Sequence, residues 1–475
     1  MGSEWVQYRL GDITTWTSGG TPPKSKDEYW NGDIPWISAS SMDGNRYNDS
    51  KLKITDLGLA NGSRIALKDS ILLLVRGSIL HQKIQVGIAL RDVAFNQDVK
   101  ALKVNTDVVE PWYLLFWFMA NHEKLLGLVE NTGIGAGKLD TTILQNLIVD
   151  VPPKEYRQQL LVFAKALDDK IELNRQINTT LESMAQALFK SWFVDFDPVI
   201  DNALAAGNPI PPELETRAEK RKQLQARNPA APTPNPAGDD IAAGFHSNFL
   251  PAEIQQLFPS SFVFTEEMGW VPEGWDKGKL GDYVHVKRGG SPRPIHDFLV
   301  EEGLPWVKIS DATSDSSRFL MNTKQFIKPE GLKKTVMLKA GELILSNSAT
   351  PGLPKFLNID ACIHDGWLYF PVKTKFTDPY LYQLFLVVKE KLLAQGNGSV
   401  FTNLKTDILK SLSVIVPPTE IMEIATTLLD SFHNKSLLIQ SNISVLQSLR
   451  DNLLPKLLSG QLQIPEAEQK LAEVL

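Results

Sequence analysis

The sequence predicts an α+β protein in which one design occurs twice, each copy being a mainly β domain followed by a long helix. Three observations lead to this fold class. Motifs recur at fixed offsets along the 475 residues. The front of each copy holds short β-branched and aromatic runs broken by Gly, Pro, Asn and Asp. The rear of each copy has apolar residues at helical spacing.

The repeat is visible in three pairs of matching stretches. Leu10-Gly11-Asp12 corresponds to Leu280-Gly281-Asp282, and Pro35-Trp36 corresponds to Pro305-Trp306, both at an offset of 270. Further along, KLDTTILQNLIVDVPP corresponds to NLKTDILKSLSVIVPP at an offset of 265. These matches predict β domains at residues 1–153 and 270–418, helical regions at 154–199 and 419–475, and a linker with a lead-in segment at 200–269.

Each β domain contains one helix candidate, PWYLLFWFMANHEKLL in the first copy and PYLYQLFLVVKEKLL in the second. Apolar residues at helical spacing normally face a protein core. We therefore expect these aromatic stripes to lie in the two cores and not to form a base-stacking surface. The linker contains a charged segment expected to form a short helix, then a Pro-rich tract that can sustain neither helix nor sheet. The stretch FLPAEIQQLFPSSFVF that follows is expected to pack back on one of the domains.

The rear helices carry a nearly heptad apolar pattern, which is typical of helices that supercoil around each other. We expect the two helices to pair as a coiled coil; the alternative is that each packs only on its own β domain. The predicted core positions of the pair are Leu173, Ile177, Leu181, Met184, Leu188, Leu446, Leu449, Leu453 and Leu457.

Composition excludes several classes of protein. A single cysteine, Cys362, rules out an internal disulfide framework and indicates a reducing compartment. The chain has neither a signal-peptide pattern nor an apolar stretch that could cross a bilayer, so we expect a cytoplasmic protein with no membrane partner. The net charge of -6 does not by itself indicate nucleic acid, because electrostatic binding to phosphates requires a basic surface.

Two short stretches suggest a phosphate-binding loop and a metal site, but neither matches the residue pattern that such a site requires. The glycine-rich residues 133–138 lack the first glycine of a phosphate-binding loop, since Thr132 stands there, and Leu139 follows the lysine. The second copy loses the Gly-Lys altogether, so we predict a contact loop. Cys362, His364 and Asp365 match no metal spacing, and in a strand residues 364 and 365 would face opposite ways. We predict a structural or surface role for them, and we find no catalytic or metal-binding motif.

Several stretches resemble one family. LGDITTWTSGGTP with IPWIS, the VRGS turn, the repeated LDTTILQNLIVDVPP frame and the segment LFKSWFVDFDPV are similar to the specificity subunit of type I restriction-modification systems. The resemblance covers nearly the whole chain. It implies two target recognition domains, each reading half of a bipartite, asymmetric site in double-stranded DNA. It also implies an antiparallel coiled coil that sets an unread spacer between the half-sites.

The resemblance further implies a subunit without catalytic activity of its own. Its partners would be two modification subunits, which bind S-adenosylmethionine and methylate adenine, and two restriction subunits, which use ATP and magnesium. A fused methyltransferase-nuclease is the enzymatic alternative, and it would need catalytic motifs. A two-headed protein-binding scaffold is the other alternative, and it would lack a sequence-specific DNA footprint.

Base readout needs polar or cationic side chains on loops that can reach a groove. For each residue chosen on this basis, the alternative is a solvated surface side chain. In the first copy the predicted DNA contacts are Lys24, Ser38, Ser40, Arg76, Ser78, His81, Gln82, Lys83 and Lys138. In the second copy they are Lys287, Arg288, Ser291, Arg293, Lys308, Ser310, Asn347, Ser348, Thr350 and Lys405.

Overall fold

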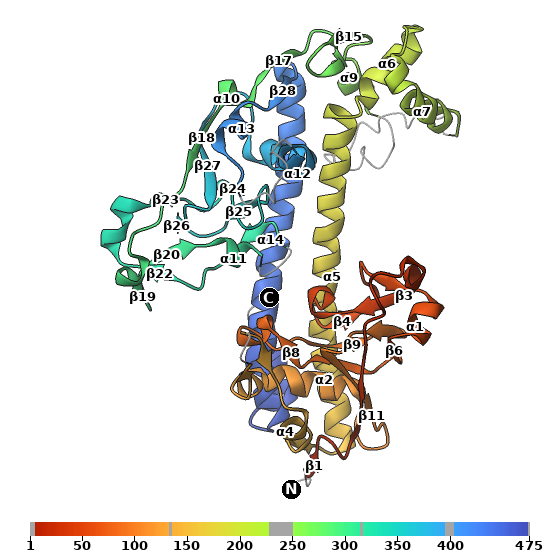
Figure 1. Ribbon diagram of the computed structural model, residues 1–475, viewed down its shortest axis with the longest axis vertical. Helices are drawn as coiled ribbons and strands as arrows, with labels where there is room; N and C mark the ends of the chain where they lie inside the picture. The colour runs from red at the N-terminus through yellow and green to blue at the C-terminus, as the bar shows by residue number, and fades with distance from the viewer. Residues whose placement is uncertain (1–4, 133–134, 228–249, 314–316, 395–402, 474–475) are drawn as a thin grey trace. The chain divides into compact units, whose positions relative to one another are not determined.

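The computed structural model describes every residue except 1–4, 133–134, 228–249, 314–316, 395–402 and 474–475 (Figure 1). The chain divides into two compact units. Unit 1 comprises residues 1–174 and 442–475, and unit 2 comprises residues 175–441. Each unit contains one β domain and a portion of both long helices, α5 (Lys154–Phe193) and α14 (Thr419–Leu458).

The β domain of unit 1 is built on two main sheets. The five-stranded sheet has the order β2 (Thr14–Ser18), β11 (Val99–Val104), β7 (Ile71–Leu74), β9 (Val86–Ala89), β4 (Arg46–Tyr47). The four-stranded sheet has the order β5 (Lys53–Ile54), β3 (Trp30–Ile37), β10 (Val93–Phe95), β6 (Arg64–Ala66). A two-stranded ladder of β1 (Val6–Arg9) and β14 (Ile148–Val151) joins the two ends of the domain.

Unit 2 has a corresponding arrangement, with one additional strand in its second sheet. Its first sheet has the order β18 (Val284–Arg288), β27 (Trp367–Lys373), β24 (Leu343–Ser346), β25 (Pro354–Leu357), β21 (Phe319–Leu320). Its second has the order β19 (Leu299–Val300), β22 (Phe326–Ile327), β20 (Leu304–Val307), β26 (Ala361–Ile363), β23 (Val336–Leu338). The ladder of β17 (Asp276–Lys279) and β28 (Ser413–Val416) matches that of β1 and β14. The α+β class and the tandem repeat are confirmed.

The repeated Gly-Gly pairs mark the place where the backbones of each β domain come closest. A side chain at Gly19 would place its Cβ 2.2 Å from the carbonyl oxygen of Phe95. In unit 2, a Cβ on Gly289 would lie 2.4 Å from the carbonyl oxygen of His364. Contacts that short are not tolerated, so only glycine fits after β2 and after β18. The motif is thus explained by packing in both copies.

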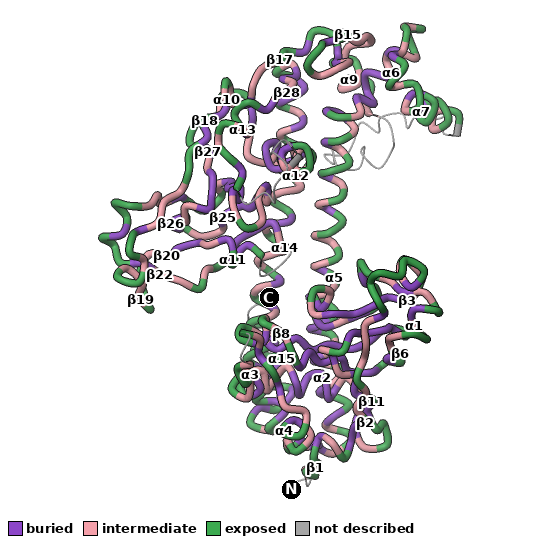
Figure 2. Tube along the Cα trace, in the orientation of Figure 1, coloured by how far each residue is buried: buried purple, intermediate pink, exposed green. Residues whose placement is uncertain are grey.

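The helices of the β domains lie in the cores, as expected from their aromatic stripes. In α2 (Pro111–Ala120) every side chain from Tyr113 to Phe118 is buried. The single helix expected there is interrupted at Asn121, after which α3 (His122–Leu126) begins. Its counterpart in unit 2 is α12 (Asp378–Ala394), where Tyr380, Leu381 and Phe385 are buried. Figure 2 shows the buried positions running through both domains.

Within each unit the long helices share one hydrophobic core. In unit 1, Leu160 of α5 lies in the same cluster as Leu453 and Leu457 of α14. The Tyr156 hydroxyl donates a hydrogen bond to the Leu457 carbonyl at 2.9 Å, whereas Asp168, three turns later, meets Arg450. Later residues of one helix thus meet earlier residues of the other, so the helices run antiparallel where they contact in this unit. In unit 2, Phe189 and Ile421 belong to one cluster. A continuous coiled coil stays a prediction.

The core positions predicted for the helix pair need one correction. Leu181, Leu446, Leu453 and Leu457 are buried, while Ile177, Met184, Leu188 and Leu449 are half-buried. Leu173, by contrast, is 49% exposed and does not belong to the buried face. The inward positions beside it are Ile171, which is fully buried, and Asn174, which is 5% exposed. A prediction from the spacing of apolar residues cannot identify a buried polar residue such as Asn174, so it assigns the inward position to an apolar neighbour.

The region between the copies is more ordered than a linker. The charged segment forms α7 (Glu215–Arg227), as expected, and α7 pairs with an unexpected helix, α6 (Asp197–Ala206). Two ion pairs join them, Arg217 with Asp197 at 2.6 Å and Arg221 with Asp201. The Pro-rich tract at 228–249 lies outside the described residues.

The remaining elements pack on the two units. The lead-in segment contains α9 (Ala252–Gln255) and a hairpin of β15 (Phe262–Thr265) and β16 (Gly269–Pro272). Phe258 of this segment is buried in the core of unit 2, so its expected packing on a domain is confirmed. At the end of the chain, α15 (Ile464–Ala472) packs into the core of unit 1. None of the helices in the described ranges has both the length and the apolarity needed to cross a membrane.

Candidate nucleic-acid interface

A three-stranded sheet brings two predicted contact residues of unit 1 together. The glycine-rich stretch forms a hairpin of β12 (Glu130–Asn131) and β13 (Gly137–Lys138), and β13 pairs with β8 (Arg76–Gly77). In this ladder Lys138 lies opposite Arg76. Both side chains are exposed, and the Lys138 ammonium lies 3.6 Å from the Asp140 carboxylate. Residues 133–134 lie outside the description.

The remaining predicted residues in this part of unit 1 follow β8 directly. A short 3-10 helix, η3 (Ser78–His81), carries two of them, and Gln82 and Lys83 come next. Ser78, His81 and Gln82 are exposed and Lys83 is half-buried. The sequence segment and the hairpin thus form one polar surface, which we call patch 1. Patch 1 consists of Arg76, Ser78, His81, Gln82, Lys83 and Lys138.

In unit 2, a turn centred on Asp365 gathers several predicted residues. The Ser291 hydroxyl donates to the Asp365 carboxylate at 2.8 Å, and an Arg293 guanidinium nitrogen lies 3.3 Å from its other oxygen. Arg288 Nε donates to the Asp365 carbonyl at 2.5 Å. His364 Nε2 lies 3.0 Å from the same carboxylate. The strand β26 ends at Ile363, so His364 and Asp365 lie in the turn and contact each other; the expected opposite orientation is wrong.

The protonation states of the turn follow from these contacts. Burial alone would raise the pKa of Asp365, but the Ser291 hydrogen bond and the nearby His364, Arg293 and Arg288 lower it overall. Burial lowers the pKa of His364, assisted by the neighbouring lysine and arginines. The turn therefore presents an ionised carboxylate, a neutral imidazole and two guanidinium groups at neutral pH.

Next to this turn, unit 2 has a backbone pairing that corresponds to the pairing of β8 with β13 in patch 1. Ser348 forms a β-bridge with Asn403, which is 265 residues beyond Lys138, and the Leu404 amide donates to the Asn347 carbonyl at 2.6 Å. Asn347 is only 3% exposed, and its side-chain amide donates to the Asp365 carbonyl, so it holds the turn. Together these residues form patch 2. Patch 2 consists of Arg288, Ser291, Arg293, Asn347, Ser348, Thr350, His364, Asp365 and Lys405.

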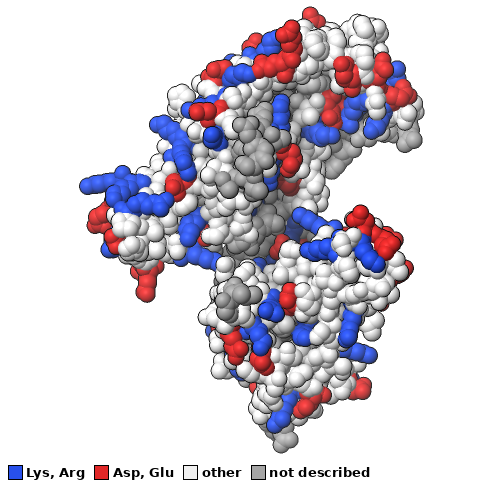
Figure 3. All heavy atoms as spheres, viewed as in Figure 1, with Lys and Arg blue, Asp and Glu red and all other residues white. Residues whose placement is uncertain are grey.

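Lys and Arg side chains gather over the β18–β27 and β23–β26 portion of unit 2 in Figure 3. Cations on such a surface suit a polyanion, because phosphate contacts supply much of the affinity for DNA. The other predicted residues lie outside the patches or inside the fold. Lys24, Ser40, Lys287 and Ser310 are exposed, Lys308 is half-buried, and Ser38 is 8% exposed with its hydroxyl 3.0 Å from that of Ser40.

One turn of unit 1 that was not predicted as a contact corresponds to the Asp365 turn. It follows β10, the counterpart of β26, and reads Asn96-Gln97-Asp98. Gln97 is exposed, and Thr21 donates to its side-chain oxygen at 2.6 Å. The two turns share no residue type at matching positions, so only the equivalence of β10 and β26 in the two sheets reveals the relation.

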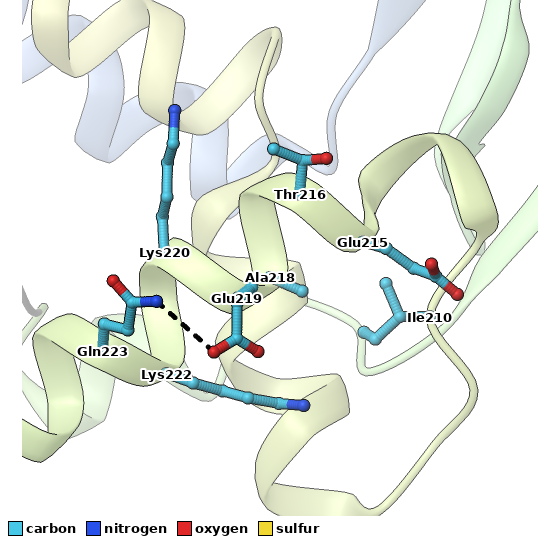
Figure 4. Close-up of a pocket in the computed structure, with 8 residues that line it drawn as sticks. All are labelled: Ile210, Glu215, Thr216, Ala218, Glu219, Lys220, Lys222 and Gln223. Carbon is cyan, nitrogen blue, oxygen red and sulfur yellow. Dashed lines mark hydrogen bonds between the residues drawn. The ribbon is translucent and has the colours of Figure 1, made fainter.

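A shallow pocket on α7 is unrelated to both patches. Figure 4 shows it lined by Ile210 and by polar side chains of α7, among them Glu215, Glu219 and Lys222. Gln223 donates to Glu219 within the lining at 3.5 Å, as helix neighbours do. The described parts of the chain hold no group of three or more His, Cys, Asp or Glu residues arranged to bind a metal ion.

The family model described as "Type I restriction modification DNA specificity domain" matches residues 2–183 and 272–447. The chain belongs to this family. Its two β domains are therefore specificity domain 1, in unit 1, and specificity domain 2, in unit 2. The two matched ranges also include much of α5 and α14, so the family match continues beyond each β domain into a long helix.

Relatives of known name match over almost the full length. The specificity subunit of the type I restriction enzyme HindI from Haemophilus influenzae is 27% identical over 490 residues, covering 97% of this chain and 100% of the relative. The MjaIX specificity subunit from Methanocaldococcus jannaschii is 24% identical over 482 residues, covering 98% and 94%. A crystal structure of the type I restriction-modification S subunit from M. genitalium aligns with a TM-score of 0.47 and 13% identity over 96% of each chain.

Proposed function

We propose that this chain is the DNA specificity subunit of a type I restriction-modification complex, and that each specificity domain reads one half of a bipartite DNA site. The observation that carries the proposal is the pair of specificity domains whose first sheets have corresponding strand orders, each domain presenting a polar loop cluster where the residues after that sheet's central strand pair with a later segment. Two readers that differ in loop residues suit a site whose halves differ in sequence.

In each patch, charged and uncharged side chains are suited to different contacts with DNA. Arg76 and Lys138 in patch 1, and Arg288 and Arg293 in patch 2, would contact phosphates or the guanine edge. Uncharged side chains such as Gln82 and Ser348 would add hydrogen bonds to base edges. The chain is proposed to hold no cofactor itself. Methylation with S-adenosylmethionine, and ATP-driven cleavage with magnesium, would be supplied by two modification and two restriction subunits.

Exchange of one specificity domain tests the proposal. The chain is co-expressed with the modification subunit of its own locus, and methylated adenines are mapped in host DNA by single-molecule sequencing. We expect a bipartite motif with a fixed spacer, and we expect one half of it to change when residues 1–150 are replaced by those of another family member. A stable complex that leaves no motif would favour the protein-scaffold alternative.

Arg76→Ala is expected to weaken recognition of one half-site only. Arg76 is exposed in patch 1, and loss of a specific arginine contact to DNA typically costs about 1–3 kcal/mol, or roughly 5- to 150-fold in affinity. Methylation rates on sites with single base changes in each half would report the loss. Arg91→Ala is the matched control, because Arg91 is also exposed but follows the last residue of β9, whereas Gln82 and Lys83 of patch 1 precede the first. Equal losses at both halves would contradict the assignment.

A further inference from the structure

A buried carboxylate in unit 1 ties specificity domain 1 to both long helices. Asp168 of α5 is 2% exposed. Its Oδ1 accepts hydrogen bonds from Asn45 Nδ2 at 2.9 Å and from Arg450 Nη1 at 3.3 Å, and its Oδ2 accepts from Arg46 Nε at 3.0 Å and Nη2 at 2.6 Å. Asn45 and Arg46 belong to the β domain, and Arg450 belongs to α14. We call this set, Asp168 with Asn45, Arg46 and Arg450, the Asp168 clasp.

The clasp is closely fitted on the domain side. The Arg46 guanidinium also lies 4.9 Å from the ring centroid of Trp112 at the start of α2, and it pairs with Asp169 at 2.6 Å. Burial would lower the pKa of Arg46, but hydrogen bonds to Asp168 and Asp169 raise it overall. A carboxylate removed from water is stable only when its oxygens are satisfied, and here four donors converge on it.

Unit 2 has a clasp at the corresponding place, in which the arginine again belongs to the β domain and the carboxylate to α5. Arg318 directly precedes β21, the counterpart of β4, and is 9% exposed. It forms an ion pair with Glu182 of α5 and lies 5.0 Å from the ring centroid of Tyr382 in α12. His433 of α14 stands 265 residues beyond Asp168, and its ring lies 5.2 Å from that of Phe319. We call this set, Arg318 with Glu182, Tyr382 and His433, the Arg318 clasp.

We propose that Asp168 and Arg318 are positioning residues that hold each specificity domain at one orientation on the helices, and so restrict the chain to one spacer length between half-sites. This inference rests on the proposed function. Apolar contacts between a domain and a helix allow small sliding movements, because they have no preferred direction. A buried ion cluster permits one geometry, and specifying register is the best-supported role of such polar groups in protein interiors.

The geometry of DNA explains why a small movement of a domain would change which spacer length the chain accepts. One base pair more or less rotates a half-site by about 34°, given about 10.5 base pairs per turn. A domain held at one orientation cannot follow that rotation. A domain with a loosened clasp can follow part of it, and the chain would then accept neighbouring spacers.

The test uses the complete modification complex with Asp168→Asn. DNA substrates carry the natural motif with the natural spacer or with one base pair added or removed, and the readout is the ratio of methylation rates. We expect the preference for the natural spacer to fall about tenfold, equivalent to about 1.4 kcal/mol. Simple destabilisation would lower all rates together and leave the ratio unchanged. The control is Asp169→Asn, which removes a partner of the same Arg46 but changes a side chain that is 57% exposed.

A second measurement does not depend on DNA. Spin labels on two exposed residues of unit 1, Lys68 in the domain and Gln159 on α5, report the distance between domain and helix in the full chain. We expect a narrow distance distribution in the parent chain and a broad one in Asp168→Asn. An unchanged distribution, or a broad one with an unchanged spacer ratio, would overturn the inference. A parent complex without any methylation motif would instead refute the proposed function. The spin-label distances would still show whether Asp168 fixes the domain on the helix.

Discussion

Phe189→Ala is expected to lower the unfolding free energy of unit 2 by about 3–5 kcal/mol, the usual cost of truncating a fully buried phenylalanine. Phe189 is 1% exposed near the end of α5. Its ring lies 4.9 Å from that of Tyr380 in α12 and 5.2 Å from that of Phe193, centroid to centroid. The change therefore removes a link between a helix that follows specificity domain 1 in sequence and the core of specificity domain 2.

Amide hydrogen exchange resolved by peptide would measure this loss. Protection in α12 and in β24 and β27 should fall, while protection in the strands of unit 1 should change much less, because Phe189 lies in the core of unit 2. Val194→Ala provides the comparison, since Val194 is 36% exposed just after the same helix. Protection that falls equally in both units would mean that the two cores unfold as one.

The boundaries of the two units do not coincide with those of the two sequence repeats, because the units share the long helices. Specificity domain 1 is followed in sequence by α5, yet the last turns of α5 belong to the core of unit 2. In the same way, the last turns of α14 belong to the core of unit 1. Each reader is therefore completed by a helix portion from the other copy. Repeats detected by sequence matching do not reveal this exchange, because matching compares residues and not contacts.

Much of the fold could be predicted because the repeat constrains it twice. A motif retained in both copies, such as Gly19-Gly20 and Gly289-Gly290, has a steric cause in each, because a Cβ on any of these glycines would lie within 2.4 Å of a backbone carbonyl oxygen. The long helices were predictable from their apolar spacing, and they begin at Lys154 and Thr419, directly after the two Pro-Pro pairs. Elements held by apolar burial leave a regular pattern in the sequence.

Elements held by polar contacts were the ones missed. Leu173 was predicted to face inward because it is apolar, but Asn174 occupies the buried position. The helix α6 was not predicted, and the two Asp–Arg pairs that join it to α7 have no characteristic spacing in the sequence. Both clasps are also polar. Buried polar groups depend on partners that are distant in sequence, so a single sequence does not disclose them.

The candidate interface shows the same limit. Arg76 and Lys138 were identifiable because VRGS and the LDTT frame occur in recognisable positions, and the ladder of β8 and β13 then brings them together. The roles of Asn347 and Asp365 were not identifiable. Asn347 was predicted as a DNA contact but is buried beneath the turn, and Asp365 organises Arg288 and Arg293 from a turn that was taken for a strand.

Acidification is expected to destabilise unit 2 through His433. Burial, and then the charge of Arg318, lowers the pKa of His433 to about 4, whereas an unfolded histidine has a pKa near 6.5. Below about pH 6.5 the unfolded chain therefore binds a proton that the folded chain excludes. The contribution of neutral His433 to the free energy of unfolding is therefore complete above about pH 6.5 and is lost as the pH falls toward 4. Its size is at most about 3 kcal/mol, because one pKa unit corresponds to about 1.4 kcal/mol and the ring is partly exposed.

Denaturant unfolding at several pH values between 4 and 7 would measure this slope, and His433→Phe would isolate it. A phenyl ring retains the aromatic packing on Phe319 and Phe356 but cannot be protonated, so the variant should lose most of the slope. Asp378 and Asp430, whose pKa values burial raises, contribute with the opposite sign and remain in the variant. A slope that persists unchanged in His433→Phe would show that another group is responsible. A slope that is lost or reversed would assign the acid sensitivity of unit 2 to protonation of His433, whose ring packs against Phe319 and Phe356.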